Sequence, residues 1–401
     1  MPLPLGNKSD VDFGVGVSDD SDLGAGAGVG AGVGVGVDIG DHPSSPLPLL
    51  NSSGHVAHCG RCLDGLPSSL VEMDASRMAI AFYCLGTLDV TNYAERKISS
   101  TDRESWKEWI WDQYVGERGG FRPGPFMGSG DSAELLSETE ATTTSTAPPH
   151  LIMTYCALLA LATLRDDYAK LDRAALARMV GACQDADGGF ATMPGGGDAD
   201  LRMTYCAFVV CALLDDWSCI DLAHALKYIQ RCRTYEGGYG QTPQGESLGG
   251  PTYCALAALH LVPPDHPYAP AARLQPAERH ATVRWLVYMQ AEATGGFSGR
   301  TNKLADACYG FWCGAALAIL GAGDFLDARA LGRYLAQCQY KFGGISKAPG
   351  EHPDPYHTYL SIAAAAIVSP DPGWELQALD PIINATHERR DGQRRMYLLR
   401  R

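Results

Sequence analysis

A carboxylate, a thiol and an imidazole could share one chemical task in this chain. Asp306 and Cys308 lie two residues apart in the segment Leu304–Trp312, and His357 follows Cys308 by 49 residues, in the segment Pro353–Tyr359. Oxygen, sulfur and nitrogen donors of this kind leave a four-coordinate Zn²⁺ with one open position, which is typical of a catalytic site. The spacing alone is weak evidence. Taken singly, these residues fit a capping Asp, a small buried Cys and a capping His.

A repeat predicts how the three residues are brought together. Copies of a Tyr followed by small apolar residues start at Tyr155, Tyr205, Tyr253, Tyr309 and Tyr359, at intervals of 50, 48, 56 and 50 residues. Each of the last four copies follows an amphipathic stretch ending in Gln (Gln184, Gln230, Gln290, Gln337) and a glycine pair (188–189, 237–238, 295–296, 343–344). A period of this length indicates an array of supersecondary units that bury their faces against one another.

Each unit is predicted to contain two helices. The stretch that ends in Gln has one polar face, whereas the stretch that starts at Tyr is apolar nearly all round and should be buried. The glycine pair is expected to end the first helix, at positive φ. About six hairpins, counting a divergent one around residues 81–83, predict an all-α fold. They could close into a ring with partly solvent-exposed outer helices and buried apolar inner helices, or they could form an open solenoid. The period alone does not determine whether the array closes.

The register of the repeat places the candidate ligands side by side. Asp306 and Cys308 precede Tyr309 by three residues and one residue, and His357 precedes Tyr359 by two. All three therefore belong to the N-terminal ends of inner helices in adjacent repeats. This shared register favours a metal site over three unrelated residues.

Cations gather near the same helix ends. Arg300 and Lys303 lie on the loop before Asp306, and Lys347 lies on the equivalent loop of the next repeat. Cations beside helix N-termini and a metal form an anion site, here for a phosphate-bearing substrate, although scattered solvated cations are the alternative. Apolar inner helices add aromatic side chains that could line a cavity, or simply pack the core: Tyr205, Tyr253, Phe311 and Trp312. Together these features suggest alkyl transfer from a lipid diphosphate to a thiol.

Composition restricts the class of protein. The 401 residues are 46% hydrophobic and carry a net charge of −14, which argues against nucleic acid as a partner. Thirteen cysteines, many inside apolar stretches, suit a reducing cytosol, so we expect a cytoplasmic protein. No apolar run is long enough for a transmembrane segment, and no signal-peptide pattern is present.

The chain divides into three parts by composition. Residues 1–50 are of low complexity, rich in Gly and Val, and are expected to be disordered. Residues 51–385 form the repeat domain, with a disordered insertion near 128–149, and residues 386–401 form a charged C-terminal tail. His55, His58, Cys59 and Cys62 are a second candidate metal site. We favour ordinary helix residues there, because no paired knuckle follows.

Several motifs resemble those of the β subunits of the protein prenyltransferases, most closely the type I geranylgeranyl enzymes. The similarity spans about residues 55–369 and is carried by the segments 73–83, 202–206, 235–239, 299–312 and 353–357. The resemblance implies an α–α toroid, obligate pairing with a helical-repeat α subunit, and one Zn²⁺. It also implies transfer of a 20-carbon isoprenoid from geranylgeranyl diphosphate to the Cys of a C-terminal Cys-a-a-X motif, as in small GTPases.

The resemblance implies roles for particular residues. Asp306, Cys308 and His357 correspond to the zinc ligands of the family. Arg300, Lys303, Tyr309 and Lys347 correspond to diphosphate-binding positions, and Arg202 to a position near the peptide's C-terminus. Ala79, Tyr83, Tyr205, Cys254, Trp312 and Tyr356 correspond to positions of the isoprenoid and peptide pocket.

Four positions bear on which member of this family the chain resembles. The farnesyl enzymes have Trp at the position of Ala79, and the smaller side chain leaves room for one more five-carbon unit. Those enzymes also have an Asp that helps to hold Mg²⁺ where this chain has Lys347, so Mg²⁺ is not expected to be required. Leu248 replaces a usual diphosphate-binding His, and Tyr356 resembles the farnesyl enzymes. The alternatives are therefore a farnesyltransferase β subunit or a helical-repeat scaffold with a structural zinc. A terpene cyclase is disfavoured because the Asp-x-Asp-Asp acid is missing.

Overall fold

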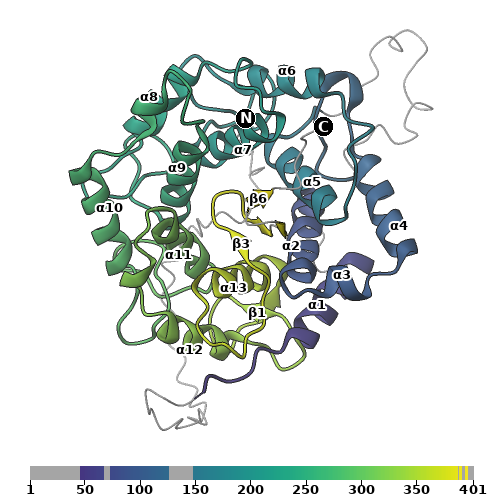
Figure 1. The fold of residues 1–401 in the computed structure, drawn as a ribbon, viewed down its shortest axis with the longest axis vertical. Helices are drawn as coiled ribbons and strands as arrows, with labels where there is room; N and C mark the ends of the chain where they lie inside the picture. Colours follow the sequence, from purple (N-terminus) through teal and green to yellow (C-terminus); the bar gives the residue numbers. More distant parts are fainter. Residues whose placement is uncertain (1–45, 67–72, 126–147, 387, 391–392, 396–401) are drawn as a thin grey trace, which may run out of the picture.

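A computed structural model describes residues 46–66, 73–125, 148–386, 388–390 and 393–395. The expectations for residues 1–45 and for the insertion at 128–147 lie outside these ranges. The described chain forms a closed ring of helices seen end-on in Figure 1. None of the helices in these ranges is both long and apolar enough to cross a membrane.

Six helices line the ring, and each contacts the next around a complete circle. They are α2 (Arg77–Val90), α5 (Leu151–Thr163), α7 (Leu201–Leu214), α9 (Gly249–Leu261), α11 (Tyr309–Ile319) and α13 (Pro355–Val368). Contacts between α13 and α2 complete the circle. The predicted inner ring is confirmed, and it is closed. Helices such as α9, buried along nearly their whole length, belong inside because no face is polar.

An outer layer covers the inner ring (Figure 1). Its helices are α1 (Ser52–Asp64), α4 (Ser100–Trp111), α6 (Arg173–Cys183), α8 (Leu222–Arg231), α10 (Pro276–Tyr288) and α12 (Ala328–Cys338), with the short α3 (Tyr93–Lys97) after α2. Short 3₁₀ turns at Gly116–Arg118, Ala269–Ala272 and Gly323–Phe325 lie between outer and inner helices. Helix α8 buries one face through residues such as Leu226 and Ile229 and exposes the other, as its amphipathic pattern predicts.

The glycine pairs lie in the turn after each outer helix, so the prediction that they end the helix was wrong. Helix α6 ends at Cys183, and Gly188 follows with φ 93°. A Cβ on Gly188 would lie 2.4 Å from the carbonyl oxygen of His224, in the first turn of the next outer helix. The glycine therefore allows close packing between successive repeats as well as the positive φ.

The same close approach recurs around the ring. Gly237, Gly295 and Gly343 meet carbonyl oxygens of Ala281, Ala330 and Gly54 in the next outer helix. Gly119 meets that of Ala175, which adds a glycine pair, 119–120, that the sequence pattern had missed. The last of these contacts joins the turn after α12 to α1, and so it closes the outer layer.

A glutamine contact also repeats from one outer helix to the next. Gln184 bonds through its side chain to both backbone groups of Asp221, the N-cap of α8. Gln339 accepts a hydrogen bond of 2.7 Å from the backbone N–H of Asn51, the N-cap of α1, and thereby links the two ends of the ring. Gln339 rather than the predicted Gln337 holds this position, since Gln337 lies exposed within α12.

Short strands complete the described chain. Strands β1 (Ile345–Ser346) and β2 (Pro353–Asp354) pair antiparallel before α13. Strands β3 (Leu379–Asp380) and β4 (Ala385–Thr386) form a hairpin, and so do β5 (Glu388–Arg390) and β6 (Gln393–Arg395). Figure 1 shows the β3–β4 chain at the centre of the ring, so residues after α13 return to the lumen.

Candidate metal and diphosphate site

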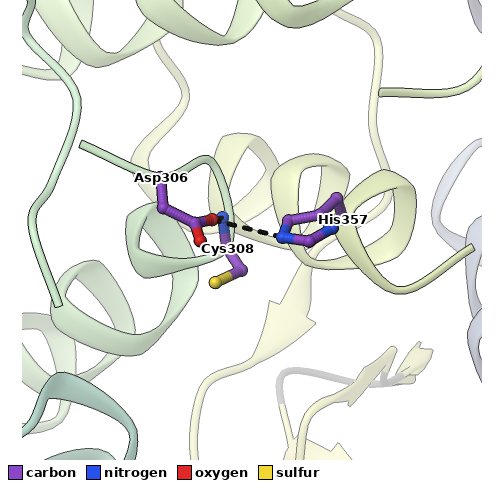
Figure 2. A group of neighbouring side chains, drawn as sticks. All are labelled: Asp306, Cys308 and His357. Atoms are coloured by element: carbon purple, nitrogen blue, oxygen red, sulfur yellow. Dashed lines mark hydrogen bonds and ion pairs between the residues drawn. The ribbon is translucent and has the colours of Figure 1, made fainter. Parts of the chain in front are cut away.

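Asp306, Cys308 and His357 form one cluster at the N-terminal ends of α11 and α13 (Figure 2). Their ligand atoms all lie within 4.8 Å of one another, and Asp306 Oδ1 lies 3.3 Å from His357 Nε2. Within the described ranges, no other group of three or more His, Cys, Asp or Glu side chains could hold a metal in this way. The repeat therefore brings the predicted ligands together across 49 residues.

Backbone hydrogen bonds fix the loop that carries the first two ligands. Asp306 Oδ1 accepts a bond of 2.9 Å from the N–H of Cys308. The N–H of Ala307 donates to the carbonyl of Lys347 at 2.8 Å, which ties this loop to the next repeat. The hydroxyl of Tyr334, on outer helix α12, donates to the carbonyl of Ala305 at 2.8 Å. The loop is held from both layers, as a preorganised site requires.

Asp354 orients the third ligand, a role that sequence reasoning missed. This residue is the N-cap of α13, and its Oδ1 accepts from the N–H of His357 at 2.8 Å. Its Oδ2 lies 2.6 Å from His357 Nδ1. The bond fixes Nδ1 as the protonated nitrogen and leaves Nε2 facing Asp306 and the thiol. The Asp-x-x-His spacing before a helix was the available signal for this contact.

Without a metal, the Cys308 thiol and the His357 imidazole of the cluster hold protons that a bound metal cation could replace. Burial, followed by the charge of Asp306, raises the pKa of the Cys308 thiol to about 12. Burial alone would raise the pKa of Asp306, but the bond to His357 keeps it below its usual value. Burial opposes charge on His357, yet bonds to Asp306 and Asp354 raise its pKa well above normal. One nitrogen, one sulfur and one oxygen donor fit a metal of intermediate softness such as Zn²⁺.

The predicted cations lie on the loops around this cluster. Lys347 follows β1 and is half-buried, and its backbone contacts the Asp306–Cys308 loop. Arg300 is half-buried and pairs with Glu246 at 2.5 Å, while the Lys303 side chain is exposed. Tyr309 opens α11 and is buried. The loops thus carry three cations toward the end of the ring where the ligand cluster lies.

Leu248 lies at the N-cap of α9 beside the loop of Arg300. It is 8% exposed and provides no side-chain cap to the helix. The neighbouring Gly249 N–H donates to the carbonyl of Gly299 at 2.8 Å, which places the two loops in contact. A His at position 248 could donate a hydrogen bond there, but a Leu side chain cannot.

Aromatic side chains of the inner helices form a continuous belt below the cluster. Ring centroids are 5.4 Å apart for Tyr205 and Tyr253, 5.2 Å for Tyr253 and Trp312, and 5.4 Å for Tyr83 and Tyr356. The Trp312 indole N–H donates to the Tyr356 hydroxyl at 3.1 Å, which links α11 to α13. The predicted pocket aromatics are therefore brought together in one belt.

The remaining predicted pocket residues lie near this belt. Ala79 is buried one helical turn before Tyr83, on the same face of α2. Cys254 is buried next to Tyr253 in α9. Arg202, on the first turn of α7, pairs with Asp200 at 2.7 Å.

The second candidate metal site is a structural element of α1. His55 is fully buried, and its Nε2 and Nδ1 bond to Gln339 and to the N–H of Gly344. Burial lowers the pKa of His55 to about 4, so its ring is neutral. His58, Cys59 and Cys62 do not form a ligand cluster with it. The preferred reading, ordinary residues of a helix, fits these contacts.

Comparison with known proteins agrees with the fold. Residues 50–385 match the model of the prenyltransferase alpha-alpha toroid domain. The chain is 33% identical over 349 residues to the geranylgeranyl transferase type-1 subunit beta of Arabidopsis thaliana, covering 84% of this chain and 89% of that one. The geranylgeranyl transferase type-1 subunit beta of Dictyostelium discoideum is also 33% identical, covering 75% of this chain and 86% of that one. The protein farnesyltransferase subunit beta of Schizosaccharomyces pombe is 29% identical, covering 81% of this chain and 82% of that one.

A solved structure shares the architecture. Candida albicans protein geranylgeranyltransferase-I, complexed with GGPP, aligns with a TM-score of 0.72 and 26% identity, over 84% of this chain and 96% of that chain. The two type-1 relatives are more similar in sequence than the farnesyltransferase subunit. The chain belongs to the prenyltransferase alpha-alpha toroid family.

Proposed function

We propose that this chain is the β subunit of a zinc-dependent protein geranylgeranyltransferase of type I. The observation that carries the proposal is the Asp306, Cys308 and His357 cluster, with cation-bearing loops around it and an aromatic belt below. The type-1 relatives over most of the chain length support the same assignment. The transferred group would be a 20-carbon isoprenoid from geranylgeranyl diphosphate, and the acceptor the Cys of a C-terminal Cys-a-a-X motif.

The ligand cluster would prepare the acceptor thiol. A Zn²⁺ held by Asp306, Cys308 and His357 would supply a fourth position at which a thiol is held as thiolate near neutral pH. Asp354 keeps His357 Nε2 available by holding Nδ1. The thiol proton would be lost to solvent as the thiolate forms. The thiolate sulfur would then bond to C1 of the isoprenoid as the C1–O bond breaks and diphosphate leaves with the electron pair.

Basic side chains would stabilise the charge that develops on the departing diphosphate. Arg300, Lys303, Tyr309 and Lys347 are the groups proposed for this task. Arg300 pairs with Glu246 in the structure and would exchange this partner for the diphosphate when the substrate binds. The Lys347 ammonium would take the place of a Mg²⁺ ion, so Mg²⁺ is not needed.

The pocket residues would select the lipid and the peptide. Ala79 leaves space on the α2 face where the farnesyl enzymes carry Trp, which favours the longer lipid. Tyr83, Tyr205, Cys254 and Trp312 would contact the isoprenoid, whereas Arg202 and Tyr356 would contact the peptide end. The enzyme would work as a heterodimer with a helical-repeat α subunit in the cytoplasm, acting on proteins such as small GTPases.

Co-expression with candidate α subunits, followed by zinc analysis and a chromatographic lipid-transfer assay, tests the proposal. We expect one zinc per heterodimer and preferential transfer of the 20-carbon group. Exclusive transfer of the 15-carbon group would identify a farnesyltransferase instead. The Ala79→Trp variant should shift preference toward the shorter lipid, and an unchanged ratio would contradict the role given to Ala79.

A second candidate function is a binding scaffold with a structural zinc. Leu248 favours it, because this residue removes a donor from the expected diphosphate site. Stoichiometric zinc with no transfer of either lipid in any α/β pairing would establish the scaffold.

A further inference from the structure

Two cysteine thiols meet where α7 passes into α8, at the opposite end of the inner helices from the ligand cluster. Cys211 lies in the last turn of α7, and Cys219 lies in the loop that leads to α8. Their sulfur atoms are 3.8 Å apart. A disulfide bond is about 2.0 Å long, so a further approach of about 1.8 Å would join them.

The loop that carries Cys219 is fixed at several points. Its first turn is tied to α7, because the N–H of Asp216 donates to the carbonyl of Cys211 at 3.0 Å. A Cβ on Gly181 of α6 would lie 2.4 Å from the Cys219 carbonyl oxygen, so the loop packs closely on the preceding outer helix. The end of the loop, Asp221, is held by Gln184.

A fixed loop keeps the two thiols together. Because neither backbone is free to move away, a reaction between the sulfur atoms has the advantage of an intramolecular reaction. The Trp217 ring packs edge-on against Phe208 of α7, with ring centroids 5.3 Å apart, and this contact presses the same loop onto the helix.

The two thiols differ in their access to solvent. Cys211 is fully buried. All thirteen cysteines lie in the part of the chain that the structure describes, and among them only Cys62 and Cys219 are partly exposed. A small oxidant from solvent therefore meets Cys219 first, and Cys211 is reached only through its neighbour.

The two thiols also differ in acidity. The hydrogen bond from Cys211 lowers the pKa of Cys219, although burial and the charge of Asp216 oppose this shift. The same contact, together with burial, raises the pKa of Cys211 well above its usual value. The thiolate is the reactive form of cysteine, so Cys219 is the better nucleophile of the pair. An accessible thiol of lowered pKa beside a second thiol is typical of redox-sensitive cysteines.

Cys62, the other partly exposed thiol, serves as a comparison. Its pKa is also lowered, by a hydrogen bond with Cys84. These two residues belong to α1 and α2, which pack against each other along their length. A disulfide there would have to draw two packed helices together, whereas Cys219 lies on a loop only eight residues from its partner.

We propose that Cys219 and Cys211 form a site of reversible oxidation, at which a hydroperoxide converts the two thiols into a disulfide. Neither residue belongs to the ligand cluster or to the predicted pocket. The site is therefore independent of the proposed lipid transfer, and either proposal can fail without the other.

The reaction proceeds in two balanced steps. The Cys219 sulfur attacks a peroxide oxygen, so an S–O bond forms, the O–O bond breaks, and an alcohol leaves after taking up the proton that the thiol had lost. The Cys211 sulfur then attacks the Cys219 sulfur, the S–S bond forms, and the S–O oxygen leaves as water with the Cys211 proton. Two thiols are oxidised as one hydroperoxide is reduced. A dithiol reductant reverses the change by thiol–disulfide exchange.

Cys211 has a protective role in this scheme. A sulfenic acid that meets no second thiol is oxidised further to a sulfinic acid, which dithiol reductants do not restore. Capture by Cys211 keeps the modification of Cys219 reversible.

The test uses the zinc-loaded αβ heterodimer, treated with one equivalent of hydrogen peroxide and then with a thiol-blocking reagent. Peptide mapping by mass spectrometry should find a linked peptide pair that joins Cys211 to Cys219 and is lost after dithiothreitol. Cys219→Ser should abolish the link. In Cys211→Ala, Cys219 should instead be trapped by dimedone as a sulfenic acid and should accumulate sulfinic acid. Cys62→Ser is the matched control, because it removes the other partly exposed thiol, and it should keep the link.

Three results would overturn the proposal. The first is that Cys211 and Cys219 stay reduced while the peroxide consumes other thiols of this chain. The second is a disulfide between Cys62 and Cys84 as the first product. The third is equal sulfinic acid at Cys219 in the wild type and in Cys211→Ala, which would show that Cys211 does not capture the intermediate. Zinc content and melting temperature establish that each variant is folded.

Discussion

Asp354 offers the sharpest test of the metal site, because one of its oxygens caps a helix and the other orients the His357 ring, and the two roles can be separated by mutation. One accepts from the His357 N–H at 2.8 Å and caps α13; the other lies 2.6 Å from His357 Nδ1. In Asp354→Asn the amide oxygen can keep the cap, since Asn and Asp cap helices about equally well. The amide nitrogen, a donor, cannot accept the Nδ1 proton. Only the orientation of the imidazole is then lost.

The expected loss follows from the role of such partners in metal sites. Removing a hydrogen bond behind a His ligand weakens metal binding by roughly 10–100-fold. At about 1.4 kcal/mol per factor of ten, this corresponds to roughly 1.4–2.8 kcal/mol of binding free energy. His357 is only 14% exposed, so water does not readily replace the missing acceptor. The melting temperature of the zinc-free protein should change little, because the cap is retained.

A matched control lies on the outer layer. Asp221 caps α8 in the same way, with Oδ1 accepting from the His224 N–H at 3.0 Å and Oδ2 lying 2.7 Å from His224 Nδ1. No metal-ligand cluster involves this pair within the described chain. Competition with a chromophoric zinc chelator should show weaker binding in Asp354→Asn and wild-type binding in Asp221→Asn. Wild-type affinity in the first variant, or an equal loss in both, would refute the reasoning.

Three further changes have defined outcomes. Lys347→Asp should make transfer depend on Mg²⁺, whereas the wild type should recover full activity when Zn²⁺ alone is restored after EDTA; Mg²⁺ dependence of the wild type would contradict the role of the ammonium. Leu248→His should lower the KM for the lipid diphosphate by about tenfold, since a hydrogen bond to a charged group contributes roughly 1.5–3 kcal/mol, and Leu248→Met should not. Gly295→Ala should lower the melting temperature more than Gly321→Ala, because both glycines have positive φ but only the first would place its Cβ 2.4 Å from Ala330 O. Equal losses would show that φ alone matters.

Several features were readable in the chain because they depend on neighbours in sequence. The apolar stretches predicted inner helices, since a helix without a polar face must be buried. The offsets of Asp306 and His357 from their repeat tyrosines predicted that they meet, because equivalent positions of adjacent repeats lie at equal heights. The Asp354 contact was also local, and a cap preceding a His could have been recognised from the spacing.

Other features depend on residues far apart and had no local signal. Closure of the ring rests on contacts such as that between Gln339 and Asn51, which are 288 residues apart. The glycine pair at 119–120 escaped notice because a long segment separates it from the helix it precedes.

The β3–β4 hairpin shows most clearly what the tertiary structure decided. Its composition gives no hint that its carbonyls meet tyrosines more than 100 residues away, such as Tyr253 at 129 residues. The sequence determined the donor set, the repeat and the class of fold, because residue types and periodicity encode them directly. Only the closed ring decided that this hairpin lies at its centre, because that position exists only once both ends of the chain have packed together.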